Sequence, residues 1–360
     1  MTEKIKVVVV DDSAFMRKIL SDLIMSDGRC DVIGKASNGL EAIEVIKNNK
    51  PDVITVDVEM PKMNGIEMLK ELYKTDKIPA IMISSITTEG AKETLEALSL
   101  GAVDFITKPE NIFSINSEEI KNDLISKVVT AANIPSWKIA KSQFKIQAKP
   151  IQVKQDKNLD MSVFSDHIDQ LVTIGTSTGG PKALQTVISH INKGFNAPIL
   201  IVQHMPKGFT ASLASRLDTM SEIHVKEAED GEILKKGVAY IAPGDKHMVI
   251  KRMSTYKYKI LLDDSEKVRG HKPSCDVMMT SVANEFKHHT IDVIMTGMGA
   301  DGSLGLKELT TKLKSYVIAQ DKDSCVVFGM PKAAIDLGLA NEVTDLKNIS
   351  HILNDKIGVI

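Results

Sequence analysis

At 360 residues the chain is too long for one ordinary hydrophobic core, and a usual size of roughly 100–200 residues per domain predicts two domains. Its 45 Lys and Arg residues against 47 Asp and Glu residues give a net charge of −2, without the basic excess that a nucleic-acid partner requires. The apolar runs are far shorter than the roughly 20 residues that cross a bilayer, and the first residues do not resemble a signal peptide, so we expect a cytoplasmic protein without membrane insertion.

The three cysteines are few, odd in number and far apart, which fits neither a disulfide framework nor a zinc site. We expect Cys30, Cys275 and Cys325 to be ordinary core or surface thiols.

Residues 1–132 alternate short β-branched runs with helical patterns, as βαβ units around a parallel sheet do. Strands are predicted at 6–10, 31–36, 52–58, 78–84 and 102–108, with helices from Ser13 to about Ser26, over 39–48, and from Ser117 onward. This pattern predicts a flavodoxin-like, five-stranded parallel α/β domain.

The pattern decays between residues 133 and 165, which are rich in Lys and Gln and lack any sustained period. We interpret this segment as a linker, because structureless loops longer than roughly 12–15 residues are uncommon inside a compact domain. Strand-like runs resume in 166–360, which we predict to be a second, doubly wound α/β domain with a mainly parallel sheet. Its predicted strands are 170–175, 198–203, 238–243, 248–251, 259–263, 291–297 and 315–320.

Polar residues follow the strands of the first domain at their carboxyl ends, where parallel sheets bind ligands. Asp11 and Asp12 follow one strand, Asp57 ends another, and Ser84 and Lys108 end two more. Clustered carboxylates repel one another and favour a hard cation such as Mg²⁺. Taken singly, Asp11 or Asp12 also suits a helix cap, Asp57 a turn and Lys108 a solvated surface.

The whole set, with VDVEMPKMNG after the middle strand and TKP after the last, resembles the receiver domain of two-component response regulators. The resemblance covers residues 4–130 and implies that Asp57 accepts a phosphoryl group from a histidine kinase. It also implies an Mg²⁺ site made by Asp11, Asp12, Asp57 and the backbone of Glu59, with Ser84 and Lys108 sensing the phosphate. Ser84 stands where many receivers have threonine, a change that keeps the hydroxyl.

In the second domain, GTSTGGP places Ser177 at a strand-to-helix turn, with Pro181 suited to the first helical turn. The glycines remove side-chain bulk, so that a substrate carbonyl can approach Ser177 and nearby backbone N–H groups. A phosphate-binding loop is the alternative, since helix N-termini attract anions, although the GK[ST] ending of a P-loop is missing.

Two further residues, His204 and Asp301, follow later strands and should reach the same sheet edge as Ser177. His204 is suited to take the serine proton, and a buried Asp301 would orient its ring. Alone, His204 suits a structural role and Asp301 a cap for the helix from Ser303 onward. The order Ser, His, Asp differs from that of the α/β-hydrolase fold, which it therefore disfavours.

The motifs GTSTGG, QHMPKGFT, KEAEDGE, YIAPGDKHM, HKPSCDVM, TGMGADG and CVVFGMP resemble the CheB-type methylesterase domain. This resemblance implies hydrolysis of glutamate γ-methyl esters on the cytoplasmic helices of methyl-accepting chemoreceptors, with a chemotaxis histidine kinase as the phosphodonor. It further implies catalysis by Ser177, His204 and Asp301 without a cofactor, and the backbone N–H of Met298 as an oxyanion donor. Some family members also deamidate glutamine.

Two other functions are weighed against this one. A DNA-binding response regulator would need a helix-turn-helix output and a basic excess, whereas the output domain here is α/β. A catalytically silent phospho-switch would lack serine reactivity. The long linker also lets the receiver cover the hydrolase site, so we expect phosphorylation to relieve inhibition.

Overall fold

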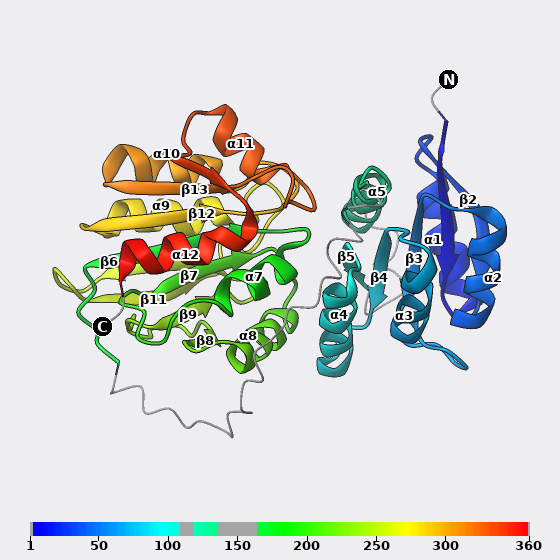
Figure 1. Ribbon diagram of the computed structural model, residues 1–360, viewed down its shortest axis with the longest axis horizontal. Coiled ribbons are helices and arrows are strands. Elements are labelled where there is room, and N and C mark those ends of the chain that lie inside the picture. Colours follow the sequence, from blue (N-terminus) through cyan, green and yellow to red (C-terminus); the bar gives the residue numbers. More distant parts are fainter. Residues whose placement is uncertain (1–2, 109–117, 136–137, 139–163, 359–360) are drawn as a thin grey trace. The chain divides into compact units, whose positions relative to one another are not determined.

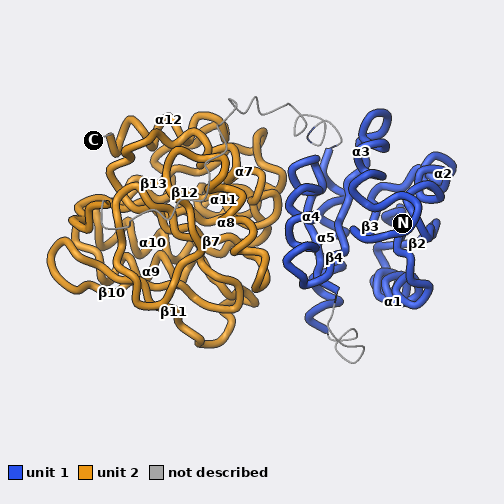
Figure 2. Tube along the Cα trace, turned by 90° about the horizontal axis from the view of Figure 1, so that it is seen from below, with its two compact units in different colours: residues 1–144 blue, residues 145–360 orange. Residues whose placement is uncertain are grey.

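The computed structural model describes residues 3–108, 118–135, 138 and 164–358, and it divides into two compact units, 1–144 and 145–360 (Figure 2). Most of the expected linker lies outside the described residues, as does Ser117, so the domain limits of 132 and 166 stay a prediction. No helix among the described residues is both long and apolar enough to cross a membrane.

The first unit is a five-stranded parallel sheet with the strand order β2-β1-β3-β4-β5, as the sequence pattern predicted (Figure 1). Helices α2, α3 and α4 contact one another in succession, and α1 contacts α5. The elements are β1 (Ile5–Val10), α1 (Ala14–Met25), β2 (Cys30–Ala36), α2 (Gly39–Asn49), β3 (Val53–Asp57), α3 (Gly65–Thr75), β4 (Ala80–Ser84), α4 (Thr88–Leu100), β5 (Asp104–Thr107) and α5 (Glu118–Ala132).

Local sequence accounts for where these helices begin. Side-chain oxygens of Ser13, Asn38 and Thr87 accept hydrogen bonds from the first helical turns of α1, α2 and α4. Asn64 and Glu67 form a reciprocal capping box at the start of α3. Each cap follows a strand, and the polar residues predicted for the site lie at the ends of these strands or directly after them.

The second unit is built around a seven-stranded parallel sheet with the order β14-β13-β12-β6-β7-β9-β8, and a separate antiparallel hairpin pairs β10 with β11. Its strands are β6 (Gln170–Thr176), β7 (Ile199–Gln203), β8 (His224–Glu227), β9 (Val238–Ile241), β10 (His247–Arg252), β11 (Tyr258–Asp263), β12 (His289–Ile294), β13 (Ser315–Gln320) and β14 (Glu342–Thr344). Its helices are α7 (Gly180–Ile188), α8 (Phe209–Met220), α9 (Cys275–Glu285), α10 (Ser303–Lys312), α11 (Met330–Asp336) and α12 (Leu346–Ile357).

The sequence pattern did not predict two strands of this sheet, β8 and β14. Both are edge strands, at opposite ends of the strand order, and they are only four and three residues long. Most residues of both strands are only partly buried, so their sequences carry no continuous apolar run. The strand predicted at 291–297 also ends earlier, at Ile294.

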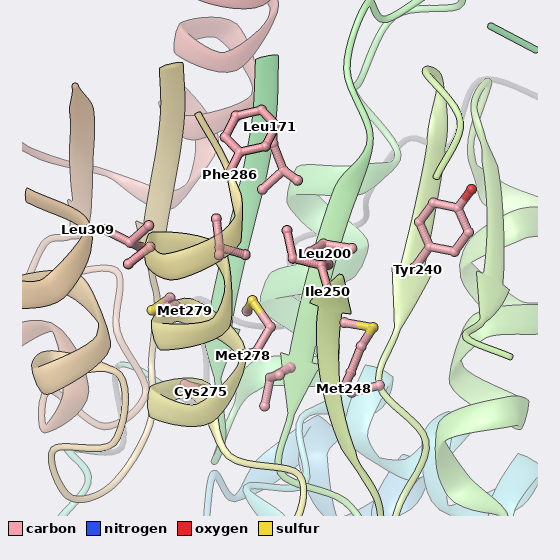
Figure 3. Packing of buried hydrophobic residues seen from close by; sticks show 14 of the residues in the cluster. Leu171, Leu200, Tyr240, Met248, Ile250, Cys275, Met278, Met279, Phe286 and Leu309 are labelled. Carbon is pink, nitrogen blue, oxygen red and sulfur yellow. The ribbon is translucent and has the colours of Figure 1, made fainter. Parts of the chain in front are cut away.

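The main core of the second unit joins one face of the sheet to α9, α10 and the β10–β11 hairpin (Figure 3). Leu171, Leu200 and Tyr240 of the sheet, together with Ile250 of the hairpin and Met278 of α9, are buried in this cluster. This packing brings the first turn of α9, beginning at Cys275, under the sheet edge that carries the predicted hydrolase residues.

Candidate functional site

The acidic residues of the first unit lie where β1 and β3 are neighbours, the point at which the strand order reverses direction. Asp11 and Asp57 are buried and Asp12 is exposed, and carboxylate oxygens of all three lie within 4.8 Å of one another. The helix-cap alternative does not apply to Asp12 or Asp11, because Ser13 caps α1. The sequence prediction that these residues converge therefore agrees with the geometry.

Lys108 is the cation of this cluster. Its Nζ lies 2.5 Å from Oδ2 of Asp57 and 3.6 Å from Oδ2 of Asp11. Burial raises the pKa of Asp57 to about 6 against the opposing effect of Lys108. Burial likewise raises the pKa of Asp11 above its ordinary value. One ammonium thus leaves the carboxylates only partly neutralised.

The residues fit a divalent cation by two observations. Oδ2 of Asp11 is buried and has no hydrogen-bond partner among the described residues, and the possible ligand atoms of Asp11, Asp12 and Asp57 are all carboxylate oxygens, which Mg²⁺ prefers. The backbone N–H of Glu59 donates to Oδ1 of Asp57 at 3.3 Å, so the Glu59 backbone lies beside the cluster.

Two further receiver residues are placed by their hydrogen bonds. The buried Ser84 hydroxyl accepts from Thr94 at 2.7 Å and donates toward the Gly90 carbonyl at 3.2 Å, so it contacts α4. Arg17, which sequence reasoning did not select, donates to the backbone carbonyls of Asp11 and Asp12 at 2.7 and 3.0 Å. Arg17 thereby braces the loop that carries both acids.

In the second unit the three predicted hydrolase residues follow strands that are neighbours where the strand order changes direction. β6 lies between β12 and β7 in the sheet. Ser177 follows β6, His204 follows β7 and Asp301 follows β12. The backbone N–H of His204 donates to the Thr176 carbonyl at 3.2 Å, and that of Ser177 to the Thr296 carbonyl at 3.0 Å. These bonds connect the strand ends that carry the three side chains.

The loop around Ser177 is tightly packed. Gln203 donates to the Ser177 carbonyl at 3.0 Å, and Gly179 takes the left-handed φ of 77° that lets α7 begin directly behind the serine. A Cβ on Gly297 would lie 2.9 Å from Cβ of Ser177, so only glycine allows the 295–299 loop this close. Met298 follows in that loop, and its backbone role stays a prediction.

The His204 ring is held on one side by Asp301. Its Nε2 lies 2.8 Å from Oδ2 of Asp301, and the His204 side chain is only 9% exposed. Its Nδ1 is buried and has no hydrogen-bond partner among the described residues. A neutral ring that donates from Nε2 therefore keeps its basic lone pair on Nδ1.

The Asp301 carboxylate is 2% exposed and sits on the N-terminus of α9. It accepts hydrogen bonds from the backbone N–H groups of Cys275 and Asp276 at 2.6 and 3.1 Å and from the Ser274 hydroxyl at 2.8 Å. Burial raises the pKa of Asp301, but the His204 bond and these N–H groups outweigh burial and hold the pKa well below its usual range. Asp301 is thus hydrogen-bonded to the His204 ring, and it is not the N-cap of α10, which is Gly302.

Sequence reasoning missed two neighbours of His204. The His271 ring stacks on the His204 ring, with centroids 3.9 Å apart and planes inclined by 10°. The Cys275 sulfur lies 3.8 Å from Nε2 of His204, and burial raises the pKa of this thiol well above its ordinary value. The motif HKPSC carries both residues, but its sequence does not show that they reach His204. All three cysteines are buried, and none of them forms a disulfide within the described residues.

The comparisons with known proteins agree with the two predicted domain types. Residues 172–353 match the CheB methylesterase family model, and residues 7–118 match the response regulator receiver domain model. A Halalkalibacterium halodurans protein-glutamate methylesterase/protein-glutamine glutaminase is 49% identical over 353 residues, 97% of each chain. This chain belongs to the CheB methylesterase family.

Other relatives are similar over nearly their whole length. The Bacillus subtilis protein of the same description is 45% identical over 96% of each chain, and that of Pyrococcus horikoshii is 43% identical over 100% of this chain and 95% of its own. The crystal structure of the Thermotoga maritima CheB methylesterase catalytic domain is 47% identical, with a TM-score of 0.50 over 52% of this chain and 98% of that one. The chain is accordingly a CheB-family hydrolase with a receiver domain, which suits phosphorylation-regulated adaptation in chemotaxis.

Proposed function

We propose that this CheB-family chain hydrolyses the γ-methyl esters of glutamates on chemoreceptor cytoplasmic helices, with Ser177 as the nucleophile, His204 as the base and Asp301 as the orienting acid. The observation that carries this proposal is the contact of His204 Nε2 with the buried Asp301 carboxylate, both of whose oxygens accept further hydrogen bonds. This contact leaves Nδ1 of His204, which is buried and has no hydrogen-bond partner among the described residues, as the basic nitrogen.

In the proposed reaction Ser177 Oγ attacks the ester carbonyl while its proton passes to Nδ1 of His204. Asp301 stabilises the imidazolium as it forms, and the backbone N–H of Met298 donates to the developing oxyanion. His204 then gives the proton to the departing methoxide, which leaves as methanol. Water, deprotonated by the same nitrogen, releases the glutamate carboxylate from the serine.

The same sequence of steps would release ammonia from a glutamine side chain. The relatives' printed descriptions name a glutaminase beside the methylesterase, which supports glutamine as a second substrate. An ammonia assay on receptors with glutamine at the modified positions tests this part separately.

In the receiver we propose that Asp57 accepts a phosphoryl group from a chemotaxis histidine kinase and that Ser84 and Lys108 respond to it. Asp11, Asp12, Asp57 and the Glu59 backbone would hold Mg²⁺, a fit supported by the buried Asp11 oxygen that accepts no hydrogen bond from the described residues. When bound, the cation offsets the negative charge that the phosphoryl group adds. Lys108 already contacts Asp57 and is placed to pair with the new charge.

The deciding experiment measures methanol release from methylated receptor membranes by the full-length chain, with and without Mg²⁺ and a small phosphodonor. We expect slow release without phosphodonor and faster release with both reagents. If no methanol is released under either condition by a folded, phosphorylated chain, the proposed esterase activity is wrong.

A further inference from the structure

At the start of each of the helices α9 and α10, an aspartate accepts hydrogen bonds from the N-terminal backbone N–H groups of the other helix. Asp301, which precedes α10, accepts from the first backbone N–H groups of α9. In return, Asp276 of α9 accepts at its Oδ1 from the backbone N–H groups of Gly302 and Gly305 at 2.9 and 2.8 Å. The N-cap position of α10 is Gly302, which has no side chain, so Asp276 supplies the missing cap from the neighbouring helix.

Close packing fixes the geometry of this exchange. A Cβ on Gly305 would lie 2.6 Å from Cβ of Met279, and a Cβ on Gly302 would lie 2.9 Å from Cδ1 of Ile294. Gly302 also has a φ of 94°, in the left-handed region. The start of α10 is therefore seated against α9 and β12. A displacement of this turn would move Asp301, the residue immediately before it.

The arrangement buries two carboxylates side by side. Asp276 is 6% exposed and Asp301 is 2% exposed. Burial and the charge of Asp301 raise the pKa of Asp276, opposed by its two backbone hydrogen bonds and by Arg269, 3.8 Å away. An asparagine would accept the same N–H bonds without this repulsion, so capping alone does not account for a carboxylate here.

We propose that Asp276 is a positioning residue of the hydrolase site. It holds the turn that carries Asp301, and its negative charge favours the imidazolium that His204 becomes during the reaction. This inference rests on the proposed role of His204 as the base. The other titratable or charged groups around the pair are His204, His247, Arg269, His271 and Cys275.

Two substitutions separate the capping role of Asp276 from its charge. Asp276→Asn keeps an oxygen that can accept the N–H bonds but removes the charge, whereas Asp276→Ala removes both. Asp345→Asn is the matched control, because Asp345 caps α12 by the same kind of bond, to the Lys347 N–H at 2.9 Å. All three are made in the full-length chain and assayed for methanol release between pH 5 and 8.

We expect Asp276→Asn to lower kcat several-fold with little change in KM and to move the acidic limb of the pH profile to lower pH. The sign follows because loss of a negative charge disfavours protonation of His204. The shift should be on the order of half a pH unit, smaller than the 1–3 units of a contacting charge, because Asp276 reaches His204 through Asp301. Asp276→Ala should lose about tenfold more activity, with the loss of both backbone bonds.

A second measurement is independent of the esterase assay and of how well the alanine variant folds. The His204 ring protons are titrated by NMR in the full-length wild type, in Asp276→Asn and in Asp345→Asn. We expect a lower His204 pKa in Asp276→Asn alone. Equal titration in all three, with kcat of Asp276→Asn equal to that of the control, would overturn the inference while the triad could still stand. Activity surviving in Ser177→Ala would instead overturn the triad.

Discussion

Both units carry a buried aspartate at the turning point of a parallel sheet, but the two aspartates are held in opposite ways. Asp57 has a single ammonium partner beside two more carboxylates, and its pKa is raised to about 6. Asp301 receives four hydrogen bonds, three of them from the start of α9, and its pKa is lowered. The number of hydrogen-bond donors around each aspartate therefore decides which chemistry the equivalent edges of the two sheets support.

A carboxylate cluster with few hydrogen-bond donors attracts a cation and can take part in phosphoryl chemistry. A carboxylate whose two oxygens both accept hydrogen bonds has no free oxygen for a metal and instead keeps its charge to orient a histidine. The His204, Cys275 and Asp301 side chains are close enough to hold a metal by distance alone, but the hydrogen bonds of Asp301 favour the orienting role.

The largest expected effect tests whether the two sites do separate chemistry. Ser177→Ala should lower methanol release by at least about a thousandfold, as removal of one member of a nucleophile–base unit does, while leaving phosphorylation unchanged.

Asp57→Asn should abolish Mg²⁺-dependent labelling by a radioactive phosphodonor while leaving basal methanol release unchanged. Labelling of Asp57→Asn at the wild-type level would place the phosphoryl acceptor elsewhere.

The next effect concerns coupling between the units. A fragment of residues 166–360 should release methanol faster than the unphosphorylated full-length chain, by about 5- to 150-fold if the coupling has a usual size. A phosphodonor should have no effect on the fragment, which lacks Asp57. A folded fragment that is slower than the unphosphorylated chain would mean that the receiver activates by direct contact and does not inhibit.

Stability should change with opposite signs at the two aspartates. At pH 7 Asp57 is above its raised pKa and its buried charge costs stability, so Asp57→Asn should stabilise the first unit by roughly 1–3 kcal/mol without Mg²⁺. Asp301 has a lowered pKa, and its charge stabilises the fold above the unfolded-state value. Asp301→Asn should therefore destabilise the second unit by about 1.5–3 kcal/mol. Denaturant unfolding in EDTA, followed separately for each unit, measures both changes; equal signs would contradict the comparison.

The smallest expected effect comes from the ring stacked on His204. His271→Ala should lower kcat by about 2- to 12-fold, the value of an aromatic pair of about 0.5–1.5 kcal/mol, because the His204 ring gains freedom to rotate. His271→Phe should retain most of the activity, since it preserves the stack. Tyr256→Ala, which removes the stack on His167, serves as the control. Equal loss in the alanine and phenylalanine variants would exclude stacking as the cause.

The sequence by itself determined the fold class and the residues at each strand end. Alternating β-branched runs and helical periods predicted the five-stranded sheet, and polar residues after those runs predicted the convergence of Asp11 with Asp57 and the placement of Ser177 and His204 after neighbouring strands. These predictions succeed because they depend on the local chain, whose period and strand direction place a residue at a known edge.

Only the tertiary structure decided how the hydrolase residues are supported. Asp301 meets the α9 N-terminus across some 25 residues of sequence and His204 across 97, and no local pattern encodes such pairings. The same holds for His271 on His204 and for Asp276 on the start of α10. These contacts arise where two helices pack under one sheet edge, so the free energy that fixes them comes from burial in the assembled core rather than from the preferences of either segment.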